Sequence, residues 1–362
     1  MAPTQLRSLL HALMAAATAA AESTRFLGRV NPATRELTWP ATGIAVAFDG
    51  TTVSIPITSQ WGTVAVELVI DDGPPIAMPN VDGSAITTPA ALPKGRHTMT
   101  VRKKSEAYFG SLFLGHPTTD GELVDLAPRP GRSIEIIGDS ISVGYGLEGV
   151  FPCANAAGNE AATKTYGALT ARNLSADYSI VAWSGKGVTR NYVAPGPDLD
   201  PRMPELWTRW GAGDEPASYD FSAAAPVDAV VINLGTNDFS FDPAIRPQLD
   251  VAAFSEAFVG FLEQVREAYP SAVVFLTGSP LLNDATAEKQ KSKHSAVMRE
   301  AAERFGPDVH FVEFPTQDAS NNNIGCDYHP SARTNQELAV ILTAAMRTVM
   351  GWDGCKRSRF RA

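Results

Sequence analysis

Four short polar segments in the second half of the chain carry residue types that could together perform acyl transfer. Ser140 follows an apolar run at residues 134–137, and a serine hydroxyl is a weak nucleophile until a base and an oxyanion site lie beside it. The other three segments contain groups of the required kinds: Gly185, Asn237 and His329. If these segments meet Ser140 in space, the chain can act as a serine hydrolase.

Each of the four residues fits one role in that chemistry. His329 could take the proton of Ser140 as a general base and return it to the leaving alcohol. The backbone N–H groups of Ser140 and Gly185 and the side-chain amide of Asn237 could donate hydrogen bonds to the oxyanion of a tetrahedral intermediate. Gly185 suits that role because a residue without a Cβ lets the backbone approach a substrate closely. Any one segment is typical of an ordinary turn, whereas all four in this order indicate a catalytic site.

The elements expected to position these residues are the strands of a parallel sheet. From residue 133 to residue 352, apolar strand-like runs such as 134–137, 178–183 and 227–234 alternate with helix-like stretches. This alternation predicts an α/β domain whose sheet is covered by helices on both faces. Such sheets bind ligands at the carboxyl ends of their strands, which is where the four segments lie.

The residues before this domain predict a different architecture. Short runs rich in β-branched residues at 52–57, 63–70 and 97–102 are separated by turns, with no helical pattern between them. Strands at this spacing predict a β-sandwich over residues 24–126. The proline-rich stretch 127–132 is the expected linker to the α/β domain.

Composition and the N-terminus restrict the class of protein. The formal net charge of −9 argues against nucleic acid or an anionic membrane surface as a partner. No run reaches the ~18 apolar residues that a membrane span needs. Residues 1–21 combine Arg7 with an alanine-rich stretch that ends in a small-residue cleavage pattern, and they predict a signal peptide and an extracellular protein. A frayed amphipathic helix is the alternative, and the sequence leaves the oligomeric state open.

With Ser140, Gly185, Asn237 and His329 in its four blocks, the second domain resembles the SGNH hydrolases, or GDSL-type esterases. The β-rich domain ahead of these blocks makes the whole chain resemble carbohydrate esterase family 2. The resemblance implies an N-terminal jelly-roll followed by a flavodoxin-like α/β/α domain. It also implies removal of acetyl groups from xylan, glucomannan and other plant polysaccharides, with no metal or other cofactor.

The chain departs from the SGNH pattern at the residue expected to orient the histidine. That family usually has an acid three residues before the histidine, and Cys326 stands there. The nearest carboxylate is Asp327, which we expect to orient His329. The alternative is a Ser–His dyad, in which a backbone carbonyl orients the imidazole. We expect Asp139 and Asp238 to be structural hydrogen-bond partners, since short acids in tight turns usually cap backbone N–H groups.

The cysteines and aromatic residues near the four segments give further expectations. Cys153 and Cys326 lie in loops that should meet at the site, so a Cys153–Cys326 disulfide is predicted, with three unrelated thiols as the alternative and Cys355 left over. No CxxC spacing is present, which argues against structural zinc. Aromatic rings can stack on sugars, so the substrate contacts are expected among aromatic residues flanking the segments, although such residues more often pack in cores: Tyr328, Phe239 and Trp183. Lys186 could reach a sugar or lie in solvent.

These observations predict a secreted serine esterase that deacetylates carbohydrate through an acyl-enzyme. One alternative is another esterase on the same scaffold, such as a lipase, a thioesterase or a feruloyl esterase, although no long apolar lid favours a lipase. The other alternative is a carbohydrate-binding protein with an inactive hydrolase domain, against which the complete set of Ser, Gly, Asn and His argues.

Overall fold

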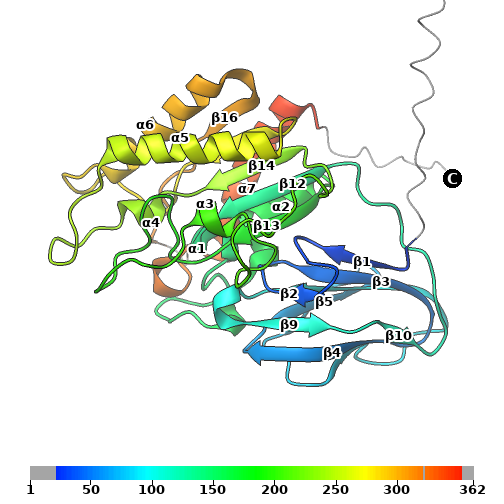
Figure 1. Ribbon diagram of the computed structural model, residues 1–362. Helices are drawn as coiled ribbons and strands as arrows, with labels where there is room; N and C mark the ends of the chain where they lie inside the picture. Colours follow the sequence, from blue (N-terminus) through cyan, green and yellow to red (C-terminus); the bar gives the residue numbers. More distant parts are fainter. Residues whose placement is uncertain (1–21, 321–322, 353–362) are drawn as a thin grey trace, which may run out of the picture.

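The computed structural model describes residues 22–320 and 323–352, which form an N-terminal β-sandwich and a C-terminal α/β/α domain (Figure 1). The predicted signal peptide at residues 1–21 and Cys355 lie outside the described residues. None of the described helices is long and apolar enough to cross a membrane.

Two antiparallel sheets face each other in the sandwich. The first has the order β1-β3-β8-β5-β6, with β11 added beside β3, and its strands are β1 (Thr24–Leu27), β3 (Gly43–Gly50), β5 (Val66–Ile70), β6 (Ile76–Met78), β8 (Gly95–Lys103) and β11 (Glu122–Leu123). The second has the order β10-β4-β9-β2, with β7 beside β4, and its strands are β2 (Glu36–Leu37), β4 (Val53–Gly62), β7 (Ala85–Thr87), β9 (Gly110–Leu114) and β10 (Thr118–Thr119). Alternate residues of both sheets, such as Val46 on β3 and Leu112 on β9, fill one apolar core. The predicted sandwich is confirmed.

The second domain is built on a five-stranded parallel sheet with the order β13-β12-β14-β15-β16. Its strands are β12 (Ser133–Gly138), β13 (Asp177–Ala182), β14 (Ala229–Asn233), β15 (Val273–Thr277) and β16 (Val309–Val312). In chain order this is 2-1-3-4-5, the flavodoxin-like arrangement, which confirms the predicted α/β/α fold. The strand order reverses at β12, so the carboxyl ends of β12 and β14 border the crevice where such sheets bind ligands.

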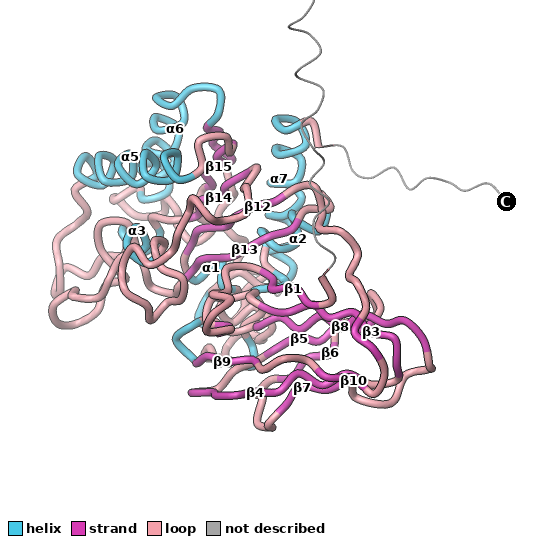
Figure 2. Tube along the Cα trace, turned by 45° about the vertical axis from the view of Figure 1, so that its right-hand side comes forward, coloured by secondary structure: helices cyan, strands magenta, loops and turns pink. Residues whose placement is uncertain are grey.

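Helices cover both faces of this sheet because its strands are apolar on both sides (Figure 2). Val230 and Ile232 of β14 pack in one cluster with α5 (Val251–Ala268) and α6 (Gln290–Phe305). The intervening residue Val231 packs on the other face with α2 (Tyr166–Asn173) and α7 (Ala332–Met350). The remaining helices are short: α1 (Ser140–Val143), α3 (Met203–Leu206), α4 (Thr236–Phe239), and the 3-10 turns η1 (Ala107–Phe109), η2 (Ala157–Asn159), η3 (Ala162–Lys164), η4 (Gly306–Asp308) and η5 (Cys326–Tyr328).

The sandwich and the α/β domain share buried contacts. Arg29 of the sandwich pairs with Glu135 of β12 at 3.0 and 3.1 Å, and both side chains are almost fully buried. Trp39 packs within the cluster that contains α5 and α6, and its indole N–H donates to the carbonyl of Trp210 at 2.8 Å. The turn at residues 104–109, between β8 and β9, meets the carboxyl edge of the parallel sheet, where Glu106 accepts the backbone N–H of Ser184 at 2.8 Å.

Candidate active site

A tight turn at the end of β12 presents the Ser140 hydroxyl. Ser140 is the first residue of α1, and the Asp139 carboxylate caps that helix by accepting the N–H of Ile141 at 3.0 Å. A Cβ on Gly138 would lie 2.0 Å from the Ser142 hydroxyl oxygen, so only glycine fits there. Burial raises the pKa of Asp139 to about 7. The structural role expected for Asp139 is confirmed.

His329 lies beside the serine with its two ring nitrogens separately engaged. Its Nε2 is 2.9 Å from the Ser140 Oγ, and its Nδ1 is 3.1 Å from the backbone carbonyl oxygen of Asp327. An Nδ1–H donated to that carbonyl leaves Nε2 free to accept the serine proton. Burial lowers the pKa of His329 to about 4, which keeps the imidazole unprotonated, and so able to accept a proton, near neutral pH. The ring of Tyr145 packs on the imidazole, with centroids 4.1 Å apart.

The carboxylate of Asp327 makes different contacts from those we expected. It accepts the hydroxyl of Tyr145 at 3.1 Å and the backbone N–H of Asn155 at 2.9 Å. Asp327 and Tyr328 both have left-handed backbones, with φ of 49° and 62°. This turn directs the main-chain carbonyl at the histidine and the carboxylate at the neighbouring loop. The expectation that the Asp327 carboxylate orients His329 is therefore corrected, and the geometry favours the dyad with a backbone carbonyl.

The two remaining segments converge on the same place. Gly185 and Asn237 border one pocket together with Ser140 and His329. Gly185 has a φ of 78°, a left-handed conformation that glycine adopts without strain. The Asn237 amide nitrogen donates to the Lys186 carbonyl at 2.8 Å and to Asp139 at 3.2 Å. The longer of these bonds is the one with which a substrate oxyanion could compete.

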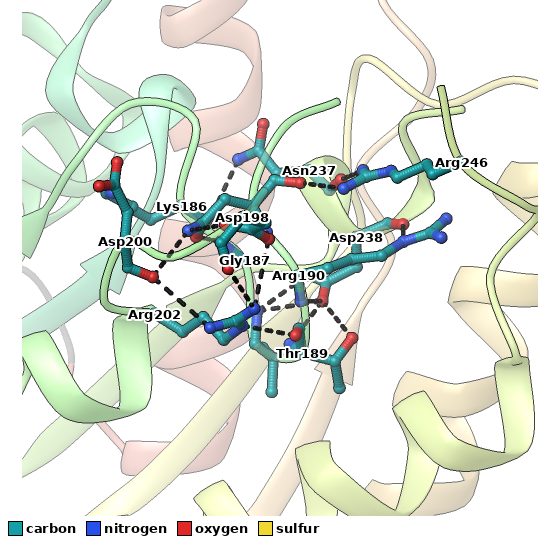
Figure 3. Close-up of polar contacts among 12 residues, drawn as sticks. Lys186, Gly187, Thr189, Arg190, Asp198, Asp200, Arg202, Asn237, Asp238 and Arg246 are labelled. Atoms are coloured by element: carbon teal, nitrogen blue, oxygen red, sulfur yellow. Dashed lines mark hydrogen bonds and ion pairs between the residues drawn. The ribbon is translucent and has the colours of Figure 1, made fainter. Parts of the chain in front are cut away.

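Asp238 holds the loop that carries Gly185 (Figure 3). Its buried carboxylate accepts the backbone N–H groups of Val188, Thr189 and Arg190, at distances from 2.7 to 3.2 Å. Arg246 donates to the carbonyl of Asn237 at 3.0 Å and ties α4 into the same network. The hydrogen bonds that the Asp238 carboxylate accepts come from residues 188–190 of this loop. The structural role expected for Asp238 is therefore confirmed.

The pocket has a volume of about 880 Å³, and both domains line it. Two of the predicted substrate contacts, Trp183 and Tyr328, lie in its wall, and Tyr328 is largely exposed. Phe239 is a correction: it is 3% exposed and packs against Phe254 in the core beneath α4. Lys186 does not reach the pocket, because its ammonium pairs with Asp200 at 3.1 Å.

Several wall residues were missed by sequence reasoning: Glu106, Tyr108, Phe109, Tyr145, Asn155, Tyr192, Leu281 and Leu282. Glu106, Tyr108 and Phe109 belong to the sandwich, whose contact with the sheet edge no local pattern reveals. Tyr192 is the exception, since it lies in the loop that follows Gly185, and an exposed aromatic residue seven positions after an oxyanion glycine was a usable signal.

A disulfide joins Cys153 to Cys326, as predicted. It connects the loop after the nucleophile to η5, which precedes His329. The backbone adds a second link, since the Asp327 N–H donates to the Cys153 carbonyl at 3.0 Å. Within residues 22–320 and 323–352, no group of three or more His, Cys, Asp or Glu side chains is arranged to hold a metal ion.

Family models match both domains. The model of the GDSL-like Lipase/Acylhydrolase family matches residues 136–337, and the model described as Carbohydrate esterase 2 N-terminal matches residues 26–128. The first match contains the Ser140, Gly185, Asn237 and His329 segments, and the second covers the sandwich. The two-domain resemblance inferred from the sequence is confirmed.

Known proteins match across both domains. A crystal structure of a carbohydrate esterase family 2 enzyme plus carbohydrate binding domain from Corynascus thermopiles (Myceliophthora fergusii) is 50% identical with a TM-score of 0.88, over 91% of this chain and 100% of that one. The cellulase/esterase CelE of Acetivibrio thermocellus is 36% identical over 87% of this chain, which spans only 38% of that protein's length. An acetylxylan esterase/glucomannan deacetylase of Cellvibrio japonicus is 29% identical over 88% of this chain and 87% of its own length.

Proposed function

The chain belongs to carbohydrate esterase family 2, and we propose that it is a serine esterase that removes O-acetyl groups from plant polysaccharides or their oligosaccharides. One observation carries the proposal: the 2.9 Å contact between the Ser140 Oγ and the His329 Nε2 in a pocket that also contains Gly185 and Asn237. Nucleophile, base and oxyanion donors are the complete set that acyl transfer requires.

The reaction proceeds in two halves. Ser140 attacks the acetyl carbonyl carbon while His329 takes the serine proton, and the Ser140 N–H, the Gly185 N–H and the Asn237 amide receive the oxyanion. The intermediate then expels the sugar alkoxide, which takes the proton from His329, and leaves an acetyl-serine. In the second half, His329 deprotonates a water molecule that releases acetate and restores the serine.

Acetylated xylan and glucomannan are the proposed substrates. An acetylxylan esterase/glucomannan deacetylase among the relatives supports this choice. The wall of the pocket supports it too, because Trp183, Tyr108, Tyr192 and Tyr328 offer aromatic faces of the kind on which sugar rings pack. The volume of about 880 Å³ leaves room for a sugar residue beside the acetyl group.

Secretion is part of the proposal. The Cys153–Cys326 disulfide supports an oxidising compartment, where such bonds persist. The sequence of residues 1–21 supports export by its basic start and alanine-rich continuation. A polymeric plant substrate is also met outside the cell.

A hydrolysis panel tests the function. Acetate release from acetylated xylan, glucomannan and oligosaccharides is compared with the hydrolysis of long-chain acyl and feruloyl esters. We expect acetate release to dominate, and we expect Ser140→Ala to lower it by at least about 10⁴-fold, as loss of the nucleophile does in serine hydrolases.

The panel separates the alternatives. Preference for long acyl or feruloyl esters would replace the proposed substrate by another esterase activity. Binding of acetylated oligosaccharide without acetate release, unchanged in Ser140→Ala, would contradict the enzyme and support a binding protein.

A further inference from the structure

Two glutamates from different domains meet at the wall of the active-site pocket. Glu106, in the sandwich turn before η1, and Glu160, in the α/β domain, are both almost completely buried. The backbone N–H of Glu106 donates to the Glu160 carboxyl group at 2.7 Å. Burial raises the pKa of both groups, and the negative charge of Glu106 raises that of Glu160 further. A hydrogen bond between two buried glutamates therefore joins the domains at this point.

On one side, this pair reaches the oxyanion site. The Glu106 Oε2 accepts the backbone N–H of Ser184 at 2.8 Å, and Ser184 directly precedes Gly185. On the other side of the glycine, the Gly185 carbonyl accepts the N–H of Tyr192 at 2.7 Å. Hydrogen bonds therefore hold the backbone on both sides of the Gly185 N–H. One of them is accepted by a carboxylate of the sandwich.

On the other side, the pair reaches the loop that orients the base. The Glu160 Oε1 accepts the Asn155 side-chain amide at 2.8 Å, and the Asn155 backbone N–H donates to the Asp327 carboxylate at 2.9 Å. The Asp327 carbonyl in turn accepts from His329. Successive hydrogen bonds therefore connect Ser184 to His329 through Glu106, Glu160, Asn155 and Asp327.

We propose that Glu106 is a positioning residue for catalysis: through the N–H of Ser184 it fixes the Gly185 N–H of the oxyanion site, and through Glu160 and Asn155 it braces the loop that orients His329. The proposal rests on the proposed function, in that it assigns the Gly185 N–H to the oxyanion. It makes the sandwich a working part of the active site, beyond its contribution to the pocket wall.

Three substitutions of Glu106 separate this role from packing. Glu106→Leu keeps a similar volume but removes the acceptor for Ser184. Glu106→Gln keeps the side-chain length and an oxygen for Ser184 but removes the negative charge. Glu106→Asp keeps a carboxylate on a side chain that is one methylene shorter, so the carboxylate lies farther from Ser184. This variant replaces Glu106→Leu in the test if the leucine variant does not fold. Glu148→Gln is the matched control, because Glu148 pairs with Lys104 across the same domain interface and has no contact with Ser184.

The measurements are kcat and KM for acetate release and the rate at which a fluorophosphonate modifies Ser140. The phosphonate reaction needs the nucleophile and the oxyanion site but no sugar. We expect Glu106→Leu to lower kcat and the phosphonate rate by about 30-fold or more, and Glu106→Asp by about tenfold, with KM within about threefold. Glu106→Gln and Glu148→Gln should keep both rates within about threefold of the wild type.

Two results would overturn the inference. One is a folded Glu106→Leu or Glu106→Asp variant that keeps wild-type phosphonate reactivity. The other is a Glu106→Gln variant that loses as much as the leucine variant, since its oxygen still meets Ser184. A wild-type protein that reacts with the phosphonate but releases no acetate would refute the proposed substrate instead, and the phosphonate rates would still decide the role of Glu106.

Discussion

At the scale of single residues, the backbone of one turn determines how the catalytic histidine is oriented. Asp327 meets His329 through its carbonyl oxygen, and its carboxylate braces Tyr145 and Asn155. A carbonyl can fix the tautomer and the ring orientation without adding a full charge next to the imidazole. Burial lowers the histidine pKa, and the hydrogen bond to the Asp327 carbonyl and the charge of the Asp327 carboxylate offset this only in part.

This arrangement predicts a small effect for Asp327→Asn. Asparagine tolerates the left-handed backbone and retains an oxygen for the Tyr145 hydroxyl and the Asn155 N–H. We expect kcat to fall by less than about tenfold, whereas replacing a triad aspartate by asparagine costs about 10⁴-fold. Steady-state kinetics of acetate release would measure this change in kcat. A loss of three or more orders of magnitude in kcat would show that the Asp327 carboxylate orients His329 after all.

The dependence of kcat/KM on pH tests the protonation state of the same histidine, His329. Only the neutral imidazole accepts the serine proton, so a pKa lowered to about 4 means that the base is available at all pH values above that. We expect kcat/KM to be lost as the pH falls through about 4, with a slope of about one log unit per pH unit. Fluorescence of the folded protein over the same range is the control for acid unfolding.

An acid limb with its midpoint near 6.5, the ordinary histidine value, would contradict this prediction. Asp139, next to Ser140, also has a displaced pKa, raised to about 7 by burial. A separate limb near pH 7 would therefore be attributed to Asp139 only if it disappeared in Asp139→Asn.

At the scale of elements, short loops after the strands carry the chemistry, and each has its own anchor. Asp238 collects the N–H groups of the loop that carries Gly185. The Cys153–Cys326 disulfide and the Cys153 carbonyl hold the loop that carries His329. Anchored loops place their groups more reproducibly than free ones, which is what an oxyanion site and a base require.

Removal of the disulfide should weaken both stability and catalysis. In the double variant Cys153→Ala and Cys326→Ala, we expect the free energy of unfolding to fall by about 2–4 kcal/mol, because the unfolded chain gains entropy. We expect kcat to fall as well, since Asp327 and His329 directly follow the lost link. Denaturant unfolding and kcat measure the two effects.

Cys355→Ala is the matched control for this experiment, and we expect it to change neither quantity. A double variant that unfolds at the same denaturant concentration as the wild type would show that the loops are held by their backbone contacts alone.

At the scale of the whole molecule, the two domains act as one unit around the pocket. Arg29 and Glu135 form a buried pair across the interface, and Trp39 of the sandwich packs in the core of the other domain. Removing one partner of a buried pair leaves an uncompensated charge, so this interface is costly to open. Across this interface, Glu106 and Tyr108 of the sandwich border a pocket whose nucleophile belongs to the other domain.

The sequence alone determined which residues form the centre of the site and which two architectures carry them. Ser140, Gly185 and Asn237 were identified because each follows an apolar strand pattern, and His329 because its segment precedes the last helix pattern. The strand patterns themselves predicted the sandwich and the parallel sheet. The structural roles of Asp139 and Asp238 also followed from local turn chemistry. The Cys153–Cys326 pairing was predicted because both cysteines lie in loops that should meet at the site.

Only the tertiary structure decided which atoms face the substrate and what supports them. Whether Asp327 presents its carbonyl or its carboxylate depends on two left-handed residues that no residue pattern specifies. Phe239 is buried and Tyr108 is exposed, because the elements packed around each residue determine its burial. Glu106 is 78 residues from Ser184 in the chain, and their contact exists only because the sandwich docks at the sheet edge. Local sequence encodes local conformation, whereas such distant contacts follow from the packing of whole domains.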